Sequence, residues 1–350
     1  MVAVLSAFPR PRAALTAGCA LLLLTSGCSG RRHAAAEGSV GYVAWSRDGR
    51  WIAWGEGIRG AGRERVRVAR ADGSKPRAVT GPIDSLGQIA WLPRRRLLYW
   101  ANFRLFVLRP GRAATEIPSY GGDGFALDAS GTRLATGDPP CSTGCDGGVV
   151  VFGVDGHVIR RLSPNTQSTS PTFSPDGRRV AFARNLCDRD GRCERPVGIW
   201  IASVADGRLK RLTKRGGSPS WSPDGTRIAY VDTGYARPSL SASLRVVSAA
   251  GGRSTTLLHA PVYAVGSPAW APDSRRLAVV AGRPSRLLIV NVSTRGVRAL
   301  RTIAVTQPVL VAWSPDSSKL LVTTRPTQQS CLSLWLVRAD GSSARLLRHC

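Results

Sequence analysis

Most of the chain consists of short stretches of alternating apolar and polar residues, separated by tight polar turns. One such unit reads WSPDGTRIAYV from Trp221, and its relatives read FSPDGRRVAFA from Phe173, WAPDSRRLAVV from Trp270, WSPDSSKLLVT from Trp313 and WSRDGRWIAWG from Trp45. Proline presets φ, aspartate bonds back to the backbone and glycine accepts positive φ, so Pro-Asp-Gly favours a tight turn. The alternation after the turn is typical of a strand. Each unit therefore predicts a β-hairpin.

The hairpin unit repeats along the chain with a nearly constant period. Two less similar copies read WLPRRRLLYWA from Trp91 and LDASGTRLATG from Leu127. The seven anchors are spaced 46, 36, 46, 48, 49 and 43 residues apart and are Trp45, Trp91, Leu127, Phe173, Trp221, Trp270 and Trp313. We expect these anchors to be core residues between repeats. A period of about 40–50 residues with strand-like content is typical of propeller and solenoid repeats.

A second strand pair follows the first in every repeat. Its copies begin at Arg65, Arg104, Gly148, Gly198, Ser243, Arg286 and Ser333. Four strands in each of seven repeats predict an all-β fold, a seven-bladed β-propeller of four-stranded antiparallel blades. The alternative is a six-bladed ring with one degenerate unit, because the copies at Trp91 and Leu127 match least. The first repeat begins with its inner strand and the last ends with its outer strand, so no strand is exchanged between the termini.

The N-terminal segment predicts export. Residues 1–12 contain Arg10 and Arg12 and no acidic residue, and residues 13–25 are apolar. This pattern is typical of a secretory signal, and the segment is too short to span a membrane. The ending Leu-Thr-Ser-Gly-Cys resembles a bacterial lipobox, which predicts lipidation of Cys28; ordinary cleavage is the alternative. The predicted organisation is a signal peptide over 1–28, a tether over 29–39 and the propeller over 40–350.

Six further cysteines are consistent with an oxidising compartment. The hairpin prediction pairs them locally, as Cys141–Cys145, Cys187–Cys193 and Cys331–Cys350, and the last pair is equidistant from the Asp340-Gly341 turn. A disulfide at the last pair would pin the outer strand of the last repeat and replace the missing exchange of strands. A zinc site is the alternative, but no histidine lies near these pairs and no finger-type spacing is present.

The chain is strongly basic, with a formal net charge of +27. The four-strand repeat places the turns of both hairpins on one rim. This predicted Arg-rich rim contains Arg47, Arg50, Arg94, Arg95, Arg96, Arg112, Arg133, Arg160, Arg161, Arg178, Arg179, Arg208, Lys210, Arg227, Arg253, Arg275, Arg276 and Arg295. Such a rim attracts anionic glycans or lipid surfaces, whereas export disfavours nucleic acid. The alternative is a solvated surface without a specific partner.

The opposite rim carries the longer loops, where binding residues usually lie. Tyrosine and arginine are common anchors of protein interfaces. The candidate binding face predicted on these loops consists of Arg59, Phe103, Tyr120, Arg189, Arg195, Tyr235, Arg237 and Tyr263.

Signals for catalysis are sparse. The four histidines, His33, His157, His259 and His349, show no metal-ligand spacing, and no Gly-x-Ser-x-Gly nucleophile elbow occurs. We therefore predict no catalytic residue, no metal and no cofactor. An enzyme in which scattered carboxylates converge at the central channel stays open as an alternative.

The repeat W-S-P-D-G-x-x-[IL]-A, followed by a strand ending in Arg-Leu-Thr at Arg211 or Arg-Leu-Leu at Arg345, resembles the TolB-type propeller repeat over residues 40–348. The resemblance implies a scaffolding role for other envelope proteins, and with the N-terminal pattern the first hypothesis is a monomeric, non-enzymatic lipoprotein anchored outside the cytoplasm. The second hypothesis is a module that binds an anionic glycan or lipid surface through the Arg-rich rim. The third is a propeller enzyme acting on a polysaccharide or a peptide.

Overall fold

The computed structural model describes residues 40–58, 61–102, 104–118, 124–137, 148–163, 167–186, 195–233, 241–261, 267–282, 285–301, 308–325 and 332–349. Within these ranges the regular secondary structure consists of β-strands. They form seven separate four-stranded antiparallel sheets. The seven-bladed prediction is confirmed. The six-bladed alternative is wrong, because the weak copies at Trp91 and Leu127 each build a complete sheet.

Each blade is one stretch of chain. The first four blades are β1 (Val40–Trp45), β2 (Trp51–Ile58), β3 (Arg63–Arg70) and β4 (Arg77–Ala78); β5 (Leu86–Leu92), β6 (Arg96–Ala101), β7 (Arg104–Leu108) and β8 (Thr115–Ile117); β9 (Phe125–Leu127), β10 (Arg133–Gly137), β11 (Val149–Gly153) and β12 (Val158–Leu162); and β13 (Gln167–Phe173), β14 (Arg179–Leu186), β15 (Arg195–Ser203) and β16 (Leu209–Arg211).

The remaining three blades repeat the same order. They are β17 (Gly217–Trp221), β18 (Arg227–Thr233), β19 (Ser241–Ser248) and β20 (Thr255–Pro261); β21 (Ala269–Trp270), β22 (Arg276–Ala281), β23 (Arg286–Asn291) and β24 (Val297–Ala299); and β25 (Pro308–Trp313), β26 (Lys319–Thr324), β27 (Ser333–Arg338) and β28 (Ala344–Arg348).

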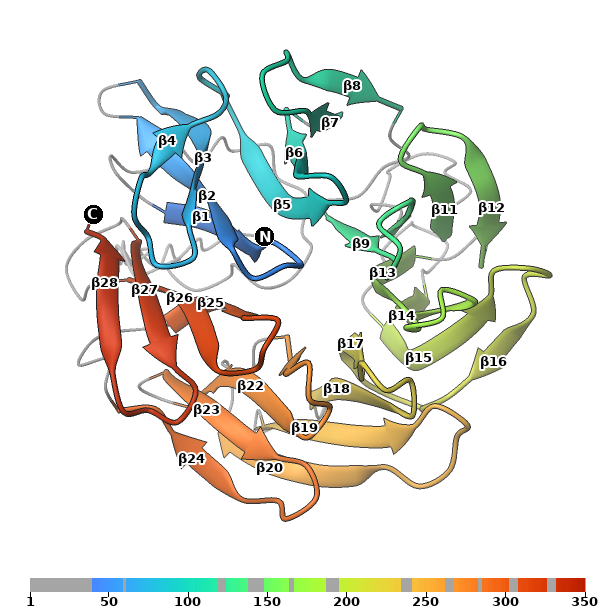
Figure 1. Ribbon diagram of the computed structural model, residues 1–350. Coiled ribbons are helices and arrows are strands. Elements are labelled where there is room, and N and C mark those ends of the chain that lie inside the picture. The colour runs from blue at the N-terminus through green and yellow to red at the C-terminus, as the bar shows by residue number, and fades with distance from the viewer. Residues whose placement is uncertain are drawn as a thin grey trace, which may run out of the picture.

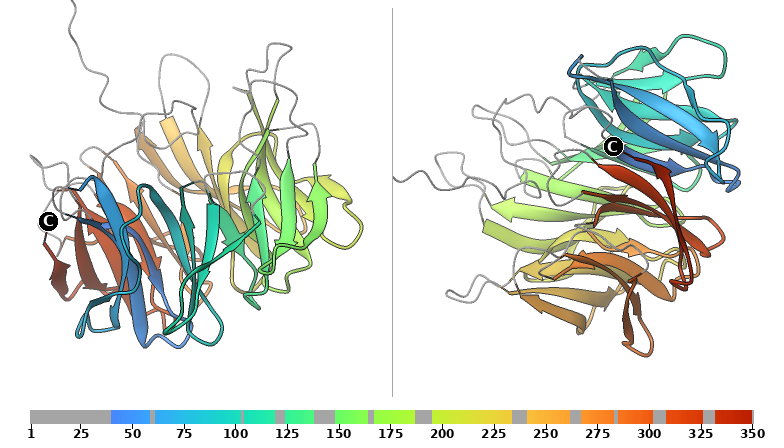
Figure 2. Two further views of the ribbon diagram at one scale, coloured as in Figure 1. Left: turned by 90° about the horizontal axis from the view of Figure 1, so that it is seen from above. Right: turned by 90° about the vertical axis from the view of Figure 1, so that its left-hand side faces the viewer.

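The blades stand side by side around a central axis, with the first strand of each blade innermost and the fourth outermost (Figure 1). The tight turns of both hairpins lie along one rim of the ring, at the lower edge of the left view of Figure 2. Second strands such as β26 are buried over nearly their whole length because both faces contact neighbouring blades, whereas the outer strand β16 is exposed throughout. Burial is therefore highest in the second strands and lower in the innermost strands, where Tyr42 and Val309 are exposed, and in the outermost strands.

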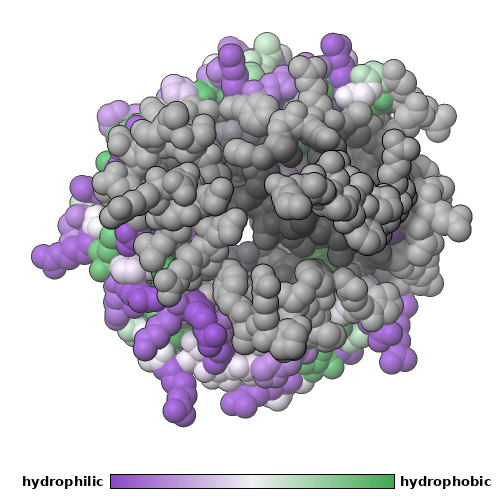
Figure 3. Space-filling model, turned by 180° about the vertical axis from the view of Figure 1, so that it is seen from behind, coloured by the Kyte–Doolittle hydropathy of each residue, from purple (hydrophilic) through white to green (hydrophobic). Residues whose placement is uncertain are grey.

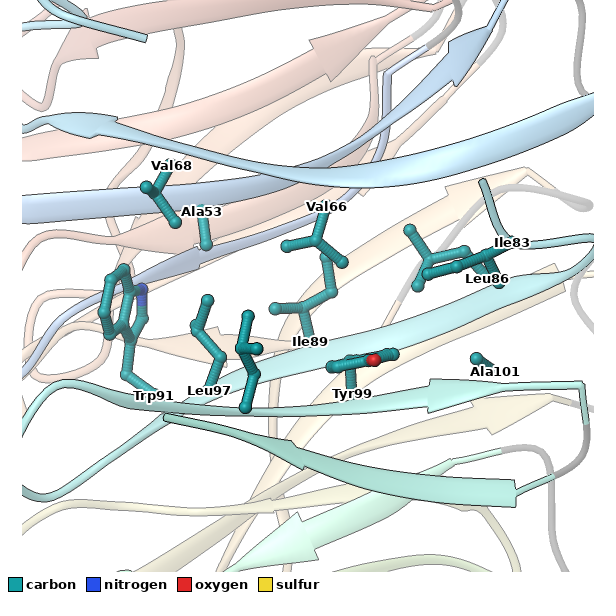
Figure 4. Packing of buried hydrophobic residues seen from close by; sticks show 11 residues of the cluster. Ala53, Val66, Val68, Ile83, Leu86, Ile89, Trp91, Leu97, Tyr99 and Ala101 are labelled. Atoms are coloured by element: carbon teal, nitrogen blue, oxygen red, sulfur yellow. The ribbon is translucent and has the colours of Figure 1, made fainter. Parts of the chain in front are cut away.

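Seven clusters of buried apolar residues fill the seven junctions between neighbouring blades. At the junction of blades 1 and 2, Val66 and Val68 from β3 face Ile89, Trp91 and Tyr99 from the next blade (Figure 4). Every repeat anchor belongs to one of these clusters, as a buried or partly buried member. The prediction that the anchors are core residues is confirmed.

Several anchor tryptophans also tie their blade to the preceding blade with a hydrogen bond. The indole Nε1–H of Trp270 donates to Ser220 O at 2.9 Å, and that of Trp313 donates to Ala269 O at 3.0 Å. Both acceptors lie on the innermost strand of the preceding blade. The anchor thus supplies apolar area and also satisfies a backbone carbonyl at the junction.

Among the strands that the structure describes, the ring closes without exchange of a strand between the first and last blades. Blade 1 contains only β1–β4 and blade 7 only β25–β28, and the two blades stand next to each other (Figure 1). Ile52, Trp54 and Ala69 of blade 1 pack against Leu321 and Leu334 of blade 7. The closing junction is therefore built like the other six, from side chains between two complete blades.

Polar contacts reinforce the closing junction. The indole of Trp45 donates to Ala312 O at 3.2 Å. Glu56, on β2, accepts from Arg65 and Arg67 at 2.9 Å each and lies 3.7 Å from Arg348 of β28. The guanidinium of Arg348 also lies 5.7 Å from the ring centroid of Trp54. A carboxylate and an indole of the first blade thus hold the last strand of the seventh.

Several sequence predictions concern residues outside the described ranges. They include the signal peptide and tether over 1–39, lipidation at Cys28, and the three disulfide pairs formed by Cys141, Cys145, Cys187, Cys193, Cys331 and Cys350. These stay predictions. Among the described residues the fold contains no helix with the length and apolarity needed to span a membrane.

Candidate functional site

The candidate binding face on the long-loop rim falls almost entirely outside the described residues. Arg195 begins β15, but its side chain is not described. The other seven residues lie outside the described ranges and are Arg59, Phe103, Tyr120, Arg189, Tyr235, Arg237 and Tyr263. Figure 3 views the molecule from this side; the described residues visible there form the periphery, where hydrophilic side chains predominate. The candidate residues that can be described in detail are those of the predicted Arg-rich rim.

The predicted Arg-rich rim divides into two classes of cation. The first class begins the second strand of a blade and stacks on the anchor of the next blade. The distances from guanidinium carbon to ring centroid are 6.0, 4.9, 5.4 and 5.1 Å for Arg133–Phe173, Arg179–Trp221, Arg227–Trp270 and Arg276–Trp313. Arg227 and Arg276 also donate to backbone carbonyls of the next blade, at Ser274 and Ser317. These arginines join blades.

Cations on the outer strands play a similar part. Arg160 donates to Val204 O and Ala205 O, and Lys210 donates to Ala250 O, in each case in the next blade. Arg160 and Arg161 were assigned to the rim from sequence, but they lie within the outer strand β12. Arg160 nevertheless reaches this rim of the next blade, because Val204 and Ala205 lie in the turn between β15 and β16. Much of the predicted rim charge is therefore used within the fold.

The second class of rim cation is exposed. Within the part of the chain that the structure describes, no hydrogen bond or ion pair engages the side chains of Arg50, Arg94, Arg95, Arg112, Arg178, Arg253, Arg275 and Arg295. All of them come from turns of the same rim. They keep their charge available for an external anion.

Where blades 1 and 2 meet on this rim, the residues differ from those at the same positions of the other repeats. The second strand begins with arginine in blades 2 to 6 and with Lys319 in blade 7, but with Trp51 in blade 1. The stacking is also inverted there, because Arg95 of the next blade lies 5.6 Å from the Trp51 ring centroid. Trp51 thus takes the place of the cation that joins blades elsewhere, and a cation of the next blade covers it.

The first turn of blade 2 departs from the repeat as well. Two consecutive residues, Arg94 and Arg95, occupy the left-handed region with φ of 60° and 58°, whereas the equivalent turns of the other blades place one residue there, a glycine in blades 1, 3, 4 and 5 and a serine in blades 6 and 7. A non-glycine residue in this conformation costs of order 1–3 kcal/mol and persists only when its surroundings enforce it. The turn presses against blade 3, since a Cβ on Gly131 would lie 2.6 Å from Pro93 Cδ.

These two departures meet at one depression of the surface, which we call the Trp51 site. It has a volume of about 510 Å³ and is lined by Gly49, Arg50, Trp51, Arg70, Ala71, Asp72 and Arg95. The lining comes from three turns, β1–β2, β3–β4 and β5–β6. Sequence reasoning placed Arg50 and Arg95 on this rim but missed Trp51, Arg70 and Asp72. Comparison of the first residue of the second strand across the seven copies would have found Trp51.

The carboxylates of the rim turns serve the turns themselves. In blade 5, Ser222 Oγ donates to Asp224 at 2.6 Å, and the backbone N–H of Thr226 donates to the same oxygen at 2.9 Å. Partial burial would raise the pKa of Asp224, but these bonds, the Thr226 hydroxyl and the nearby Arg227 charge lower it to about 2. The pKa values of Asp48, Asp176 and Asp316 are lowered in the same way, chiefly by a serine hydroxyl.

Acid should therefore destabilise the ring through these turns. A carboxyl whose pKa is about 2 when folded and about 3.9 when unfolded adds stability above pH 4 that is lost as pH falls toward 2. We expect Asp224→Asn to make the fall in urea midpoint between pH 5 and pH 2 less steep. Asp84→Asn, outside these turns, is the control. A profile for Asp224→Asn that parallels the unmodified protein would contradict this assignment.

Among the described contacts, one serine is hydrogen-bonded to a histidine. Ser243 Oγ lies 2.9 Å from His259 Nδ1, on the third and fourth strands of blade 5. The neighbouring carboxylate of Asp232 is paired with Arg245 at 2.9 Å, so among the described contacts it does not orient the imidazole as a catalytic triad requires. No group of three or more potential metal ligands occurs among the described residues.

Comparison with known proteins identifies the fold and not a family. No family model and no curated protein matches the chain. An oligogalacturonate lyase solved in complex with manganese aligns over 86% of this chain and 89% of its own, with 15% identity and a TM-score of 0.62. The oligogalacturonate lyase of Vibrio parahaemolyticus aligns over the same shares with 11% identity and a TM-score of 0.61.

A TolB propeller is also among the structural neighbours. TolB from Acinetobacter baumannii aligns over 74% of this chain and 62% of its own, with 18% identity and a TM-score of 0.50. At these identities each likeness shows a shared propeller fold. Because the neighbours include both lyases and TolB, the fold does not select an activity.

Proposed function

We propose that this protein is a non-enzymatic binding propeller of the bacterial envelope, exported and lipid-anchored, that holds an anionic ligand against its Arg-rich rim. The observation that carries the proposal is the set of eight exposed rim arginines without an ion-pair partner among the described residues. On a rigid ring their charges add to one field, which concentrates anionic polymers at the surface. The TolB-like repeat and the N-terminal pattern support the envelope location.

The chemistry of the described side chains favours binding over catalysis. The described rim aspartates accept hydrogen bonds within their own turns, and these bonds lower their pKa values. A general acid or base needs a pKa near the working pH, so these carboxylates are poorly suited to that role. The single Ser–His pair lacks a carboxylate oriented toward it in the described residues. Binding alone uses what the rim offers, which is exposed guanidinium groups.

Elution with salt tests this function directly. We expect the protein to bind immobilised polygalacturonate, but not neutral dextran, at low salt and to lose at least tenfold in affinity when the salt concentration is raised from 50 to 500 mM, because salt screens exposed charges. The triple variant Arg253→Gln, Arg275→Gln, Arg295→Gln should elute at lower salt. Retention that is independent of salt, or equal binding to dextran, would contradict the proposal.

A protein scaffold is the second candidate, and the TolB-like repeat favours it. Its predicted face, on the long-loop rim, lies outside the described residues. A discrete envelope protein that stays bound at high salt would support this candidate, because apolar interface cores resist salt.

A further inference from the structure

The Trp51 site combines chemical groups that the rest of the rim keeps apart. Arg50, Arg70 and Arg95 are exposed around the depression, the half-buried indole of Trp51 lines it, and the carboxylate of Asp72 lies at its edge. Elsewhere on the rim the indoles stacked by arginines, Trp221, Trp270 and Trp313, are buried, whereas that of Trp51 stays partly exposed although Arg95 lies 5.6 Å from its ring centroid. The site is therefore chemically distinct, and its 510 Å³ lies within the ~300–1,000 Å³ typical of small-ligand sites.

We propose that the Trp51 site binds a uronate residue of a carboxylated glycan; this ligand class rests on the proposed function and makes it more specific. The guanidinium groups pair with the carboxylate, the indole faces the ring carbons of the sugar, and Asp72 accepts a hydroxyl. A different chemical group of the site, guanidinium, indole or carboxylate, makes each of these three contacts.

The cations of the site suit a planar carboxylate. All three are arginines, whose fork of N–H donors matches two carboxylate oxygens and remains charged at every relevant pH. Trp51 and Arg70 are direct partners across β2 and β3, and the Ala71 amide donates to Arg50 O at 2.8 Å, which fixes the two turns of blade 1 to each other. Arg95 enters from blade 2 and faces the same ring.

Trp51 favours a sugar ring over a phosphate chain, and Asp72 adds an acceptor for hydroxyl groups. The indole provides an apolar surface that the C–H face of a pyranose covers and that a phosphate chain does not need. Asp72 is an acceptor without a proton to donate, because the Ser74 hydroxyl and amide lower its pKa. The ionised carboxylate accepts hydrogen bonds from sugar hydroxyls, while the arginines pair with an anion, so the site fits a ligand that carries both a carboxylate and hydroxyl donors.

The site is held rigid by the ring around it. The β3–β4 turn packs on blade 7, where a Cβ on Gly73 would lie 2.7 Å from Leu347 Cδ2, and the β5–β6 turn packs on blade 3 at Gly131. The left-handed backbone of Arg94 and Arg95 fixes the direction in which the Arg95 side chain extends toward Trp51. Such preorganisation lowers the entropy lost when a ligand binds.

Calorimetric titration of the full chain with tetragalacturonate tests the assignment. We expect binding that is lost with the methyl-esterified tetramer and at least tenfold weaker in Arg95→Gln and in Arg50→Gln. Arg275→Gln, on the distant blade 6 turn, should weaken binding less than threefold. Arg286→Gln, at the start of β23 on the opposite rim, is the matched control and should bind as the unmodified protein does. These arginines are exposed, so the variants should fold.

Other outcomes distinguish the failure of the site from the failure of the function. If Arg95→Gln and Arg275→Gln weaken binding equally, the rim acts as a diffuse field; the Trp51 assignment is then wrong while the proposed function stands. If tripolyphosphate binds as tightly and with the same dependence on Arg95, the ligand is a phosphate polymer and the uronate assignment is wrong. If neither polygalacturonate nor the tetramer binds, both proposals are wrong.

Discussion

Replacing Trp54 by alanine is expected to lower the free energy of unfolding by about 3–5 kcal/mol. Trp54 lies on β2, is 2% exposed, and packs with Ile52 and Ala69 against Leu321 and Leu334 of blade 7. Truncation removes the largest side chain of the closing junction and leaves a cavity that two complete β-sheets cannot collapse to fill. Urea unfolding followed by circular dichroism measures the loss.

A matched truncation tests whether the ring is one cooperative unit. Phe152→Ala empties the equivalent core between blades 2 and 3, where Phe152 is fully buried. In a closed ring the two truncations should cost similar amounts, because every junction has two neighbours. In an open array of repeats the terminal junction would separate first. A loss below about 1 kcal/mol for Trp54→Ala, with a full loss for Phe152→Ala, would show that the ring is not closed.

Phenylalanine at the same position separates packing from hydrogen bonding. Within the described residues, Trp54 Nε1 is buried without a hydrogen-bond partner, so Trp54→Phe should lose only packing. Trp270→Phe loses a similar volume and also leaves Ser220 O without its indole donor. We expect Trp270→Phe to be the more destabilising by about 1 kcal/mol, the usual net value of a hydrogen bond.

Removal of the Glu56 charge is expected to cost about 2–3 kcal/mol. The carboxylate is 11% exposed and accepts from Arg65 and Arg67 at 2.9 Å each, with Arg348 at 3.7 Å. Glu56→Gln keeps the shape but leaves three guanidinium groups close together without a counter-charge. The expected cost stays below that of a fully buried pair because the arginines retain contact with water.

An exposed pair provides the control for Glu56. Glu116 pairs with Arg104 at 3.1 Å, with 48% and 63% of the two side chains exposed, and Glu116→Gln should cost at most about 1 kcal/mol. Both variants are compared by their urea midpoints at the same pH and ionic strength. Equal small losses would show that the Glu56 cluster does not hold the last blade to the first.

The local part of this fold could be predicted from sequence because its causes are local. Turn chemistry and the two-residue alternation of strands act within about ten residues, and they located all seven hairpins, including the weak copies at Trp91 and Leu127. The spacing of the anchors then predicted seven blades, and the structure excluded the six-bladed alternative. Ring closure required no further sequence signal, because the first and last blades present the same apolar surfaces as the others.

The candidate site could be predicted only in part, because the role of a rim cation depends on the next blade. Arg227 and Arg275 both belong to repeat turns, yet Arg227 stacks on Trp270 while Arg275 is exposed. Likewise the sequence alone identified Arg50 and Arg95 as basic turn residues, but it did not predict that they line the same depression.

By itself, the sequence determined the strands, the turns and the total charge and favoured seven blades, since each depends on neighbours in the chain or on composition. Only the tertiary structure decided which arginines join blades, how Trp54 and Glu56 close the ring, and that Arg50, Trp51, Arg70 and Arg95 share one depression. The reason is geometric. These contacts connect different blades, and the relative placement of two blades follows from packing across their junction.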